Sequence, residues 1–192
     1  IDVGEMVARL RIIKSPAEID YQRRAALAAE AGMTAGINAA KAGNNEREVC
    51  GAVCSAMVIA GSDHPGPGVL SSGERAYHLH GGATDRVLKA GDTLQLEPTP
   101  HVRHYNARFM RTIKVGEATD EDYKIAKQLI SIQDKALETV APGVKVTVAD
   151  HLYREGIIGS GLTDAYTNKT FYSIGIMMDP TDADPLEATA TS

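Results

Sequence analysis

The sequence predicts an α+β fold, with pairs of helices and separate strands along the chain. Capped, alanine-rich helical segments alternate with short segments whose apolar residues recur at every second position. A long helix, a glycine break and a short helix occur around Ala42-Gly43 and again around Pro142-Gly143, so we predict an internal duplication. The second copy reaches only FYSIGIMM, residues 171–178, before an acidic, threonine-rich tail, and is expected to be cut short.

Capping signals mark where the predicted helices begin. The segment SPAE, from Ser15, is a capping box with proline at the first helical position. Asn45 and Thr119 each precede an acidic residue by three positions, which is the same signal. We expect long helices after these three residues and a shorter helix opened by Thr147 and Asp150.

Alternation with a period of two residues predicts three strands. They are VLSSG at residues 69–73, Thr93–Glu97, and HYNARFMRT at residues 104–112. In the second strand the two leucines share one face, so Glu97 points to the opposite, polar face. In the third strand Arg108 points with the polar side chains. The sequence therefore places an acid and a cation on polar strand faces.

The composition limits the classes of function. The chain has 192 residues, of which 43% are hydrophobic, enough for one domain with a buried core. Its 20 basic and 25 acidic residues give a net charge of -5 without any basic run, which argues against a nucleic-acid partner. No apolar run approaches the roughly 20 residues that span a bilayer, and no leader is recognised, so we expect a cytoplasmic protein. Cys50 and Cys54 are expected to be small buried residues rather than a disulfide.

The stretch ERAYHLHGGATDRVLKAGD carries His78 and His80 two positions apart. On a strand they would share one face and meet a common substrate or metal. Two solvated loop histidines, followed by glycines that only turn the chain, remain the alternative. The other histidines are expected to be structural or solvated: His64, His101, His104 and His151.

Three segments resemble a known superfamily. RIIKSPAEI at 11–19, HGGATDRVLKAGD at 80–92 and YNARFMRTIKVG at 105–116 are similar to the catalytic domain of the creatinase and proline-peptidase (M24) superfamily. The resemblance extends from Arg11 to Met178. It implies the pita-bread fold, a pseudo-twofold duplication of helices packed on a curved antiparallel sheet, here with the second half truncated.

The resemblance also implies a division of the chain. Residues 1–13 would be a linker from an absent N-terminal domain, and residues 14–178 an incomplete pita-bread domain. Residues 179–192 form an atypical tail whose acidic composition without aromatic residues is typical of disorder or of a foreign sequence.

Peptidases of this superfamily usually hold two divalent metals with two aspartates, one histidine and two glutamates. By the resemblance, Glu97 keeps a carboxylate at the first aspartate position, but Arg108 stands at the second and Ser173 at the histidine. The two glutamates would follow the last residue. We therefore expect no cofactor, and a divalent metal pair only if the protein is an ordinary peptidase.

The segment FYSIGI, together with Tyr105 and Arg111, looks closest to the creatinase and ectoine-hydrolase branch, which is thought to work without the metal pair. This implies a metal-independent C–N hydrolase for a small zwitterionic substrate, with His80 as general acid or base. The expected substrate-binding residues are His78, Glu97, Tyr105, Arg108 and Arg111. A solvated strand arginine remains the alternative for Arg108.

Two other functions remain open. One is an Xaa-Pro-type metallopeptidase homologue, which needs metal ligands that these residues do not supply. The other is a catalytically inactive pita-bread binding module, which the missing C-terminal quarter favours. Relatives commonly form homodimers, and an incomplete sheet would expose an unpaired edge, so we expect a homodimer as well as a small-molecule substrate.

Overall fold

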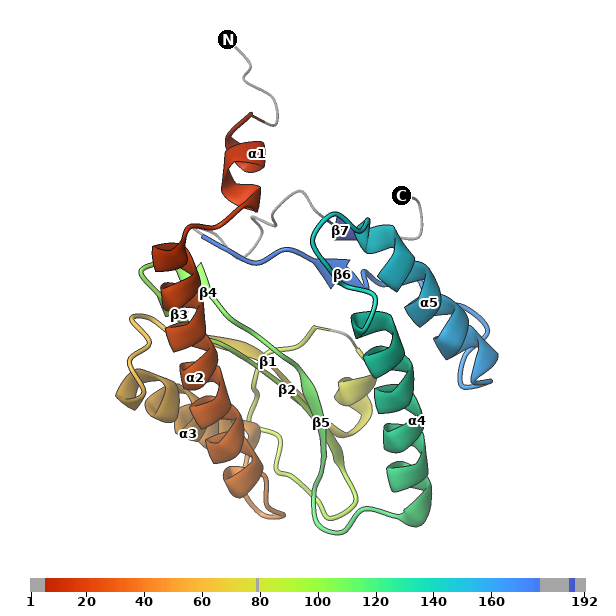
Figure 1. Cartoon of the computed structure of the whole chain (residues 1–192). Helices are drawn as coiled ribbons and strands as arrows, with labels where there is room; N and C mark the ends of the chain where they lie inside the picture. Colours follow the sequence, from red (N-terminus) through yellow and green to blue (C-terminus); the bar gives the residue numbers. More distant parts are fainter. Residues whose placement is uncertain (1–5, 79, 177–186, 189–192) are drawn as a thin grey trace. The chain divides into compact units, whose positions relative to one another are not determined.

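The computed structural model describes residues 6–78, 80–176 and 187–188. Helices and strands follow one another along the chain as labelled in Figure 1. The helices are α1 (Met6–Ile12), α2 (Pro16–Ala39), α3 (Glu46–Ile59), the 3-10 helix η1 (Gly73–Tyr77), α4 (Asp120–Leu137) and α5 (Val146–Gly159). The strands are β1 (Gly66–Ser72), β2 (Thr93–Thr99), β3 (His101–Val102), β4 (Tyr105–Asn106), β5 (Arg111–Lys114), β6 (Phe171–Tyr172) and β7 (Glu187–Ala188).

The chain forms two compact units. The first, which we call the sheet unit, comprises Lys14–Ala118 and the segment that begins at Ile174. The second, the helix-pair unit, comprises the chain start to Ile13, Thr119–Ser173 and the segment that begins at Thr181. Each unit contains one pair of packed helices, α2 with α3 and α4 with α5, as the predicted duplication requires.

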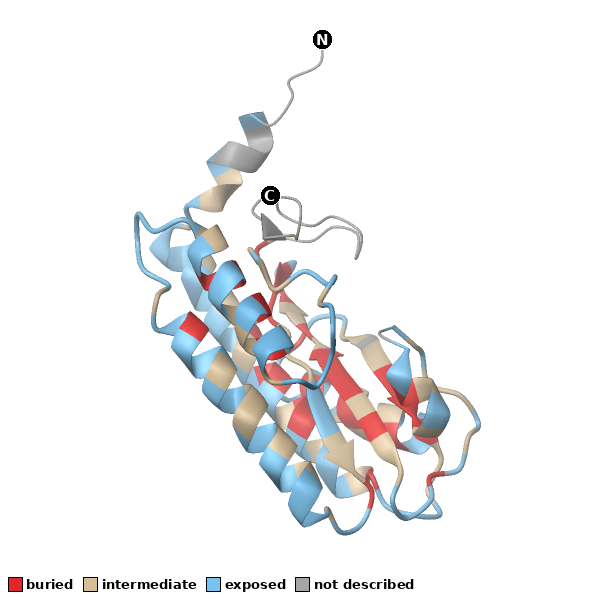
Figure 2. Ribbon diagram, turned by 90° about the vertical axis from the view of Figure 1, so that its right-hand side faces the viewer, coloured by how far each residue is buried: buried red, intermediate tan, exposed pale blue. Residues whose placement is uncertain are grey.

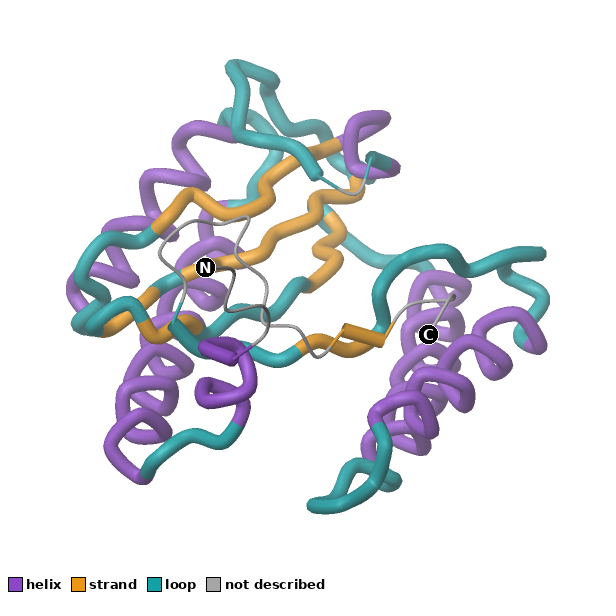
Figure 3. Tube along the Cα trace, turned by 90° about the horizontal axis from the view of Figure 1, so that it is seen from above, coloured by secondary structure: helices purple, strands orange, loops and turns teal. Residues whose placement is uncertain are grey.

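The sheet unit is built on an antiparallel sheet with the strand order β1-β2-β5. Figure 3 shows these strands side by side. Leu70 of β1 lies opposite Leu96 of β2, and Ser71 lies opposite Gln95. Because opposite residues point to the same side of a sheet, β1 and β2 share one apolar and one polar face.

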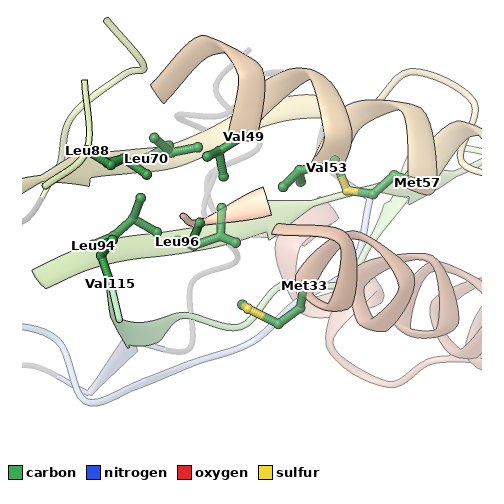
Figure 4. Packing of buried hydrophobic residues seen from close by; sticks show 10 residues of the cluster. Met33, Val49, Val53, Met57, Leu70, Leu88, Leu94, Leu96 and Val115 are labelled. Carbon is green, nitrogen blue, oxygen red and sulfur yellow. The ribbon is translucent and has the colours of Figure 1, made fainter. Parts of the chain in front are cut away.

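Helices α2 and α3 cover the apolar face. Val53 and Met57 of α3 and Met33 of α2 belong to one buried cluster with Leu70 and Leu96 of the strands (Figure 4). In Figure 2 the buried residues gather on the strands, while the outward sides of the helices are exposed. This packing leaves the polar face of the sheet turned away from the helices.

The three capping boxes predicted from the sequence are confirmed. The side chains of Ser15, Asn45 and Thr119 each accept a hydrogen bond from the backbone N three residues later, and the acidic side chain there accepts one from the backbone N of the capping residue. The fourth start was misplaced, because α5 begins at Val146 without a side-chain cap. Asp150 instead accepts a hydrogen bond from Arg154.

The prediction of one strand over residues 104–112 is wrong. Strand β4 pairs with β3, whereas β5 pairs with β2, and residues 107–110 between them are in no strand. The change of partner has a local cause in the turn before β4. Arg103 and His104 have φ values of 52° and 68°, the left-handed conformation of a tight two-residue hairpin turn.

The two ends of the chain and its two cysteines were also subjects of prediction. Helix α1 lies within the predicted linker, residues 1–13. Most of the predicted tail, residues 179–192, lies outside the described residues. Within the described ranges, no helix is both long and apolar enough to span a membrane. Cys50 and Cys54 are free thiols as predicted, but they are half-buried rather than buried.

Candidate functional site

The candidate site is the polar face of the sheet unit, defined by Ser71, Gln95, Glu97 and Thr112. Ser71 lies opposite Gln95, and Gln95 lies opposite Thr112, so these three side chains point to one side of the sheet. Glu97 is two residues further along β2 and points to the same side. The alternation in the sequence predicted this position of Glu97, and Gln95 lies two residues before it on the same face.

Glu97 and Arg108, both expected substrate-binding residues, come together at one end of this face. The Arg108 Nε atom lies 3.8 Å from Oε1 of Glu97, within ion-pair range but beyond a direct hydrogen bond. The Arg108 side chain is 28% exposed, whereas that of Glu97 is 12% exposed. The arginine therefore compensates a nearly buried carboxylate and is itself partly exposed.

Two further polar groups on this face have no hydrogen-bond partner among the described residues. They are the buried atoms Ser71 Oγ and Gln95 Oε1, whose residues lie opposite each other on β1 and β2. Buried polar atoms usually have partners, so these two atoms are available for a further hydrogen bond on this face. Sequence reasoning missed Ser71, although its place two residues before the glycine of VLSSG was visible.

Of the two possibilities that the sequence left open for His78 and His80, a shared strand face and loop positions, the structure shows loop positions. Gly73–Tyr77 forms η1, and both histidines follow it in irregular, exposed backbone. The structure nevertheless brings this segment to the site. A Cβ atom on Gly81, directly after His80, would lie 3.1 Å from the Cβ of Ser71. His80 is therefore next to a residue that packs against the polar face.

Tyr105 and Arg111 are placed differently from the other predicted site residues. The Tyr105 hydroxyl donates to Glu18 Oε1 at 2.8 Å, and its ring stacks on Tyr21. Arg111 lies opposite Leu96, so it points away from the side of Glu97. Its guanidinium lies 4.9 Å from the ring centroid of Phe109. Their role in substrate binding stays a prediction.

A separate group of histidines surrounds the β3–β4 turn. The ring of His101 lies 6.2 Å from that of His64 and 6.0 Å from that of His104. Burial, followed by the neighbouring imidazoles, lowers the pKa of His101. The pKa of Asp63 is also lowered, first by the hydrogen bond from the Arg103 backbone. The sequence predicted these histidines to be structural or solvated, and their packing agrees with a structural role.

The residues at the three compared metal positions do not form a ligand set. Glu97 supplies carboxylate oxygens, Arg108 is a cation, and Ser173 is a hydroxyl residue of the helix-pair unit. In the part of the chain that the structure describes, no group of three or more His, Cys, Asp or Glu side chains is placed to hold a metal ion. These residues alone therefore do not fit a metal pair.

The sequence is similar to a family of metallopeptidases and to several known peptidases. Metallopeptidase family M24 matches residues 20–190. An Xaa-Pro dipeptidase of Pyrococcus furiosus is 29% identical over 175 residues, which are 91% of this chain and 50% of that protein. An uncharacterized peptidase of Bacillus subtilis is 28% identical over 92% of this chain and 50% of its own length. The chain thus spans about half the length of these relatives.

Solved structures agree with these matches. Prolidase from Pyrococcus furiosus has a TM-score of 0.86 and 27% identity, covering 97% of this chain and 56% of that one. Xaa-Pro dipeptidase from Bacillus anthracis has a TM-score of 0.85 and 26% identity, covering 97% of this chain and 54% of that one. The predicted pita-bread fold, incomplete relative to its relatives, is confirmed.

The same matches correct two predictions about chemistry. The matched family is a metallopeptidase family and the relatives include Xaa-Pro dipeptidases, so the expectation that no cofactor takes part is wrong. The matches also do not support a metal-independent hydrolase. They support the Xaa-Pro peptidase, which the sequence left open as an alternative.

Proposed function

This chain belongs to metallopeptidase family M24, and from that premise we propose that it acts in a peptidase that cleaves Xaa-Pro dipeptides. The observation that carries the proposal is Glu97, which supplies a buried carboxylate on the polar face at the position where the family has one. Divalent metal ions would supply Lewis-acid activation of water in such an enzyme. The protein's own groups have the tasks of binding and orienting the dipeptide.

We assign Arg108 to the carboxylate terminus of the dipeptide. A guanidinium presents several donors in a planar fork that matches a carboxylate, and this one is partly exposed beside Glu97. Held by its carboxylate, a dipeptide would lie along the face formed by Ser71 and Gln95, where the Ser71 hydroxyl can donate or accept a hydrogen bond and the Gln95 amide oxygen can accept one. His80 would contact the substrate from the adjoining segment.

The first test is hydrolysis of Met-Pro and Ala-Pro, with Met-Ala and Ala-Ala as matched peptides that lack proline. The purified protein is assayed after incubation with manganese, cobalt or zinc, and after chelation. We expect cleavage of the proline peptides alone, and loss of cleavage on chelation. Equal cleavage of both sets, or of neither set with every metal, would contradict the proposal.

A substitution of Arg108 tests whether this residue binds the carboxylate terminus of the dipeptide. Arg108→Gln should raise KM for dipeptides with a free carboxylate by about 10- to 100-fold, because a charge-assisted contact of roughly 1.5–3 kcal/mol is lost. The same variant should change KM little for the corresponding dipeptide amides. Arg23→Gln, an exposed arginine on α2, is the matched control. An equal effect on acids and amides would show that Arg108 does not bind the terminus.

A further inference from the structure

Glu46, the first residue of α3, is a carboxylate without any exposed surface. Its Oε1 accepts hydrogen bonds from the backbone N and the hydroxyl of Ser72, at 2.9 and 2.7 Å. Its Oε2 accepts from Arg75 at 2.6 Å, and from the backbone N and hydroxyl of Thr84 at 2.8 and 2.6 Å. Five donors therefore satisfy one buried carboxylate.

This network holds Glu46 ionised. Burial is the largest single influence on its pKa and opposes ionisation, but the hydrogen bonds from Thr84, Ser72 and Arg75 outweigh it. The pKa of Glu46 is therefore lowered. A charged acceptor forms stronger hydrogen bonds than a neutral one, so its three partner residues are firmly fixed.

The partners of Glu46 enclose the segment that carries His78 and His80. Ser72 is the last residue of β1, Arg75 is in η1, and Thr84 follows the Gly81-Gly82 pair. The segment is thus tied at both ends to the same carboxylate. Between the ends, Arg75 also donates to the carbonyl of Gly82 at 2.7 Å.

The far end of the segment is also attached to the sheet. The backbone N of Leu70 donates to the carbonyl of Gly81 at 2.8 Å. Gly81 lies so close to Ser71 that a side chain there would come within 3.1 Å of the Ser71 Cβ. Ser71 belongs to the polar face, so the residue after His80 is fixed against the candidate site.

We propose that Glu46 is a positioning residue that holds the segment of His78 and His80 against the polar face through Ser72, Arg75 and Thr84. Its effect on catalysis rests on the proposed peptidase function, but its effect on the segment does not. Glu46 itself is buried under these partners and does not touch the substrate.

The test compares Thr84→Val, which removes the hydroxyl at nearly constant volume, with Thr84→Ser, which keeps it. Glu46→Gln is the third variant. Hydrogen–deuterium exchange of residues 70–84 and the imidazole NMR signals of His78 and His80 report on the segment whether or not a peptide is cleaved. Steady-state kinetics on the proline dipeptides report on catalysis.

We expect the Val and Gln variants to speed exchange in this segment by about 10-fold or more, since Thr84→Val removes a hydrogen bond to the carboxylate and Glu46→Gln removes its charge and one of its accepting oxygens. Both should shift the His80 signal and lower kcat by about 10- to 100-fold with a smaller change in KM. Thr84→Ser should restore the segment and kcat towards wild type. Val53→Ala, in the core of α3 and away from this network, controls for loss of stability alone.

Unchanged exchange and unchanged His80 signals in Thr84→Val and Glu46→Gln would overturn the proposal, whatever the activity. Faster exchange in the segment, with kcat for the proline dipeptides unchanged from the wild type, would also overturn the proposal. If the wild-type protein cleaves no peptide, the proposed function fails, and the exchange and NMR results decide the positioning role by themselves. If Glu46→Gln does not fold, the two Thr84 variants carry the test.

Discussion

Glu18 shows how one side chain serves two structures at once. Its Oε2 accepts a hydrogen bond from the backbone N of Ser15 and completes the capping box of α2, while its Oε1 accepts one from the Tyr105 hydroxyl. The hydrogen bonds from Ser15, and then from Tyr105, lower the pKa of Glu18 to about 2. The carboxylate thus joins the start of a helix to the β3–β4 hairpin.

This depressed pKa predicts a pH dependence of stability. Because the folded-state pKa lies below the unfolded one, the contribution of Glu18 is present above about pH 4.5 and is lost as the pH falls towards 2. Glu18→Gln should therefore lower the thermal midpoint at pH 7 and have almost no effect at pH 2. Glu30→Gln, on the exposed side of α2, is the control. A difference that persists unchanged at pH 2 would contradict this assignment.

Single residues also show what the sequence can and cannot predict about the site. Alternation placed Glu97 correctly, because the side-chain direction in a strand follows from parity alone. Alternation failed for Arg108 as a strand residue, since residues 107–110 leave the sheet, yet Arg108 still lies within ion-pair range of Glu97. The network of Glu46 was missed because its partners are 26 to 38 residues away in the sequence.

At the scale of elements, helices were easier to predict than strands. A capping box is a local signal that needs only four residues. All three predicted capping boxes are present in the structure. The strand over residues 104–112 depended on partners elsewhere in the chain, and β4 and β5 have different ones. Periodicity within a segment contains no information about such a change of partner.

The packing of α2 against α3 and β2 gives a prediction about two helical glycines. A Cβ on Gly36 would lie 2.3 Å from Leu96 Cδ2 and 2.9 Å from Val53 Cγ2, whereas a Cβ on Gly51 meets nothing within 4 Å. Replacing a helical glycine by alanine gains up to about 1 kcal/mol, but overpacking a core costs about 1–3 kcal/mol. Leu96 and Val53 are fully buried, so they have little room to move.

Gly36→Ala should therefore destabilise the protein by about 1–2 kcal/mol, and Gly51→Ala should stabilise it by about 0.5–1 kcal/mol. Urea denaturation of both variants beside the wild type measures the two effects under the same conditions. Stabilisation by Gly36→Ala would mean that α2 does not approach the sheet as closely as described.

At the scale of the whole molecule, we propose that the protein forms a homodimer. In the described sheet, β1 and β5 are the outer strands, and outer strands present unpaired backbone groups. Large apolar side chains such as Ile59 and Tyr77 are also strongly exposed. Light scattering at micromolar concentration should give twice the mass of the chain. A monomeric mass that does not change with concentration would contradict the proposal.

The duplicated architecture was predictable because each half repeats the same local signals, but the division into two units was not. The chain leaves the sheet unit after Ala118, passes through the helix-pair unit, and enters the sheet unit again at Ile174. Nothing in the composition of FYSIGI marks this return. It depends on backbone hydrogen bonds, which any residue other than proline can donate.

That return has a consequence for synthesis on the ribosome. Asn106 donates from its backbone to the carbonyl of Gly175, 69 residues later, and Gln22 donates to Ile174, 152 residues later. At roughly 5–20 residues per second, the β3–β4 hairpin waits about 3–14 s after it is made before these partners emerge. During that interval the nascent chain displays an unfinished β-edge, which is the kind of surface that chaperones recognise.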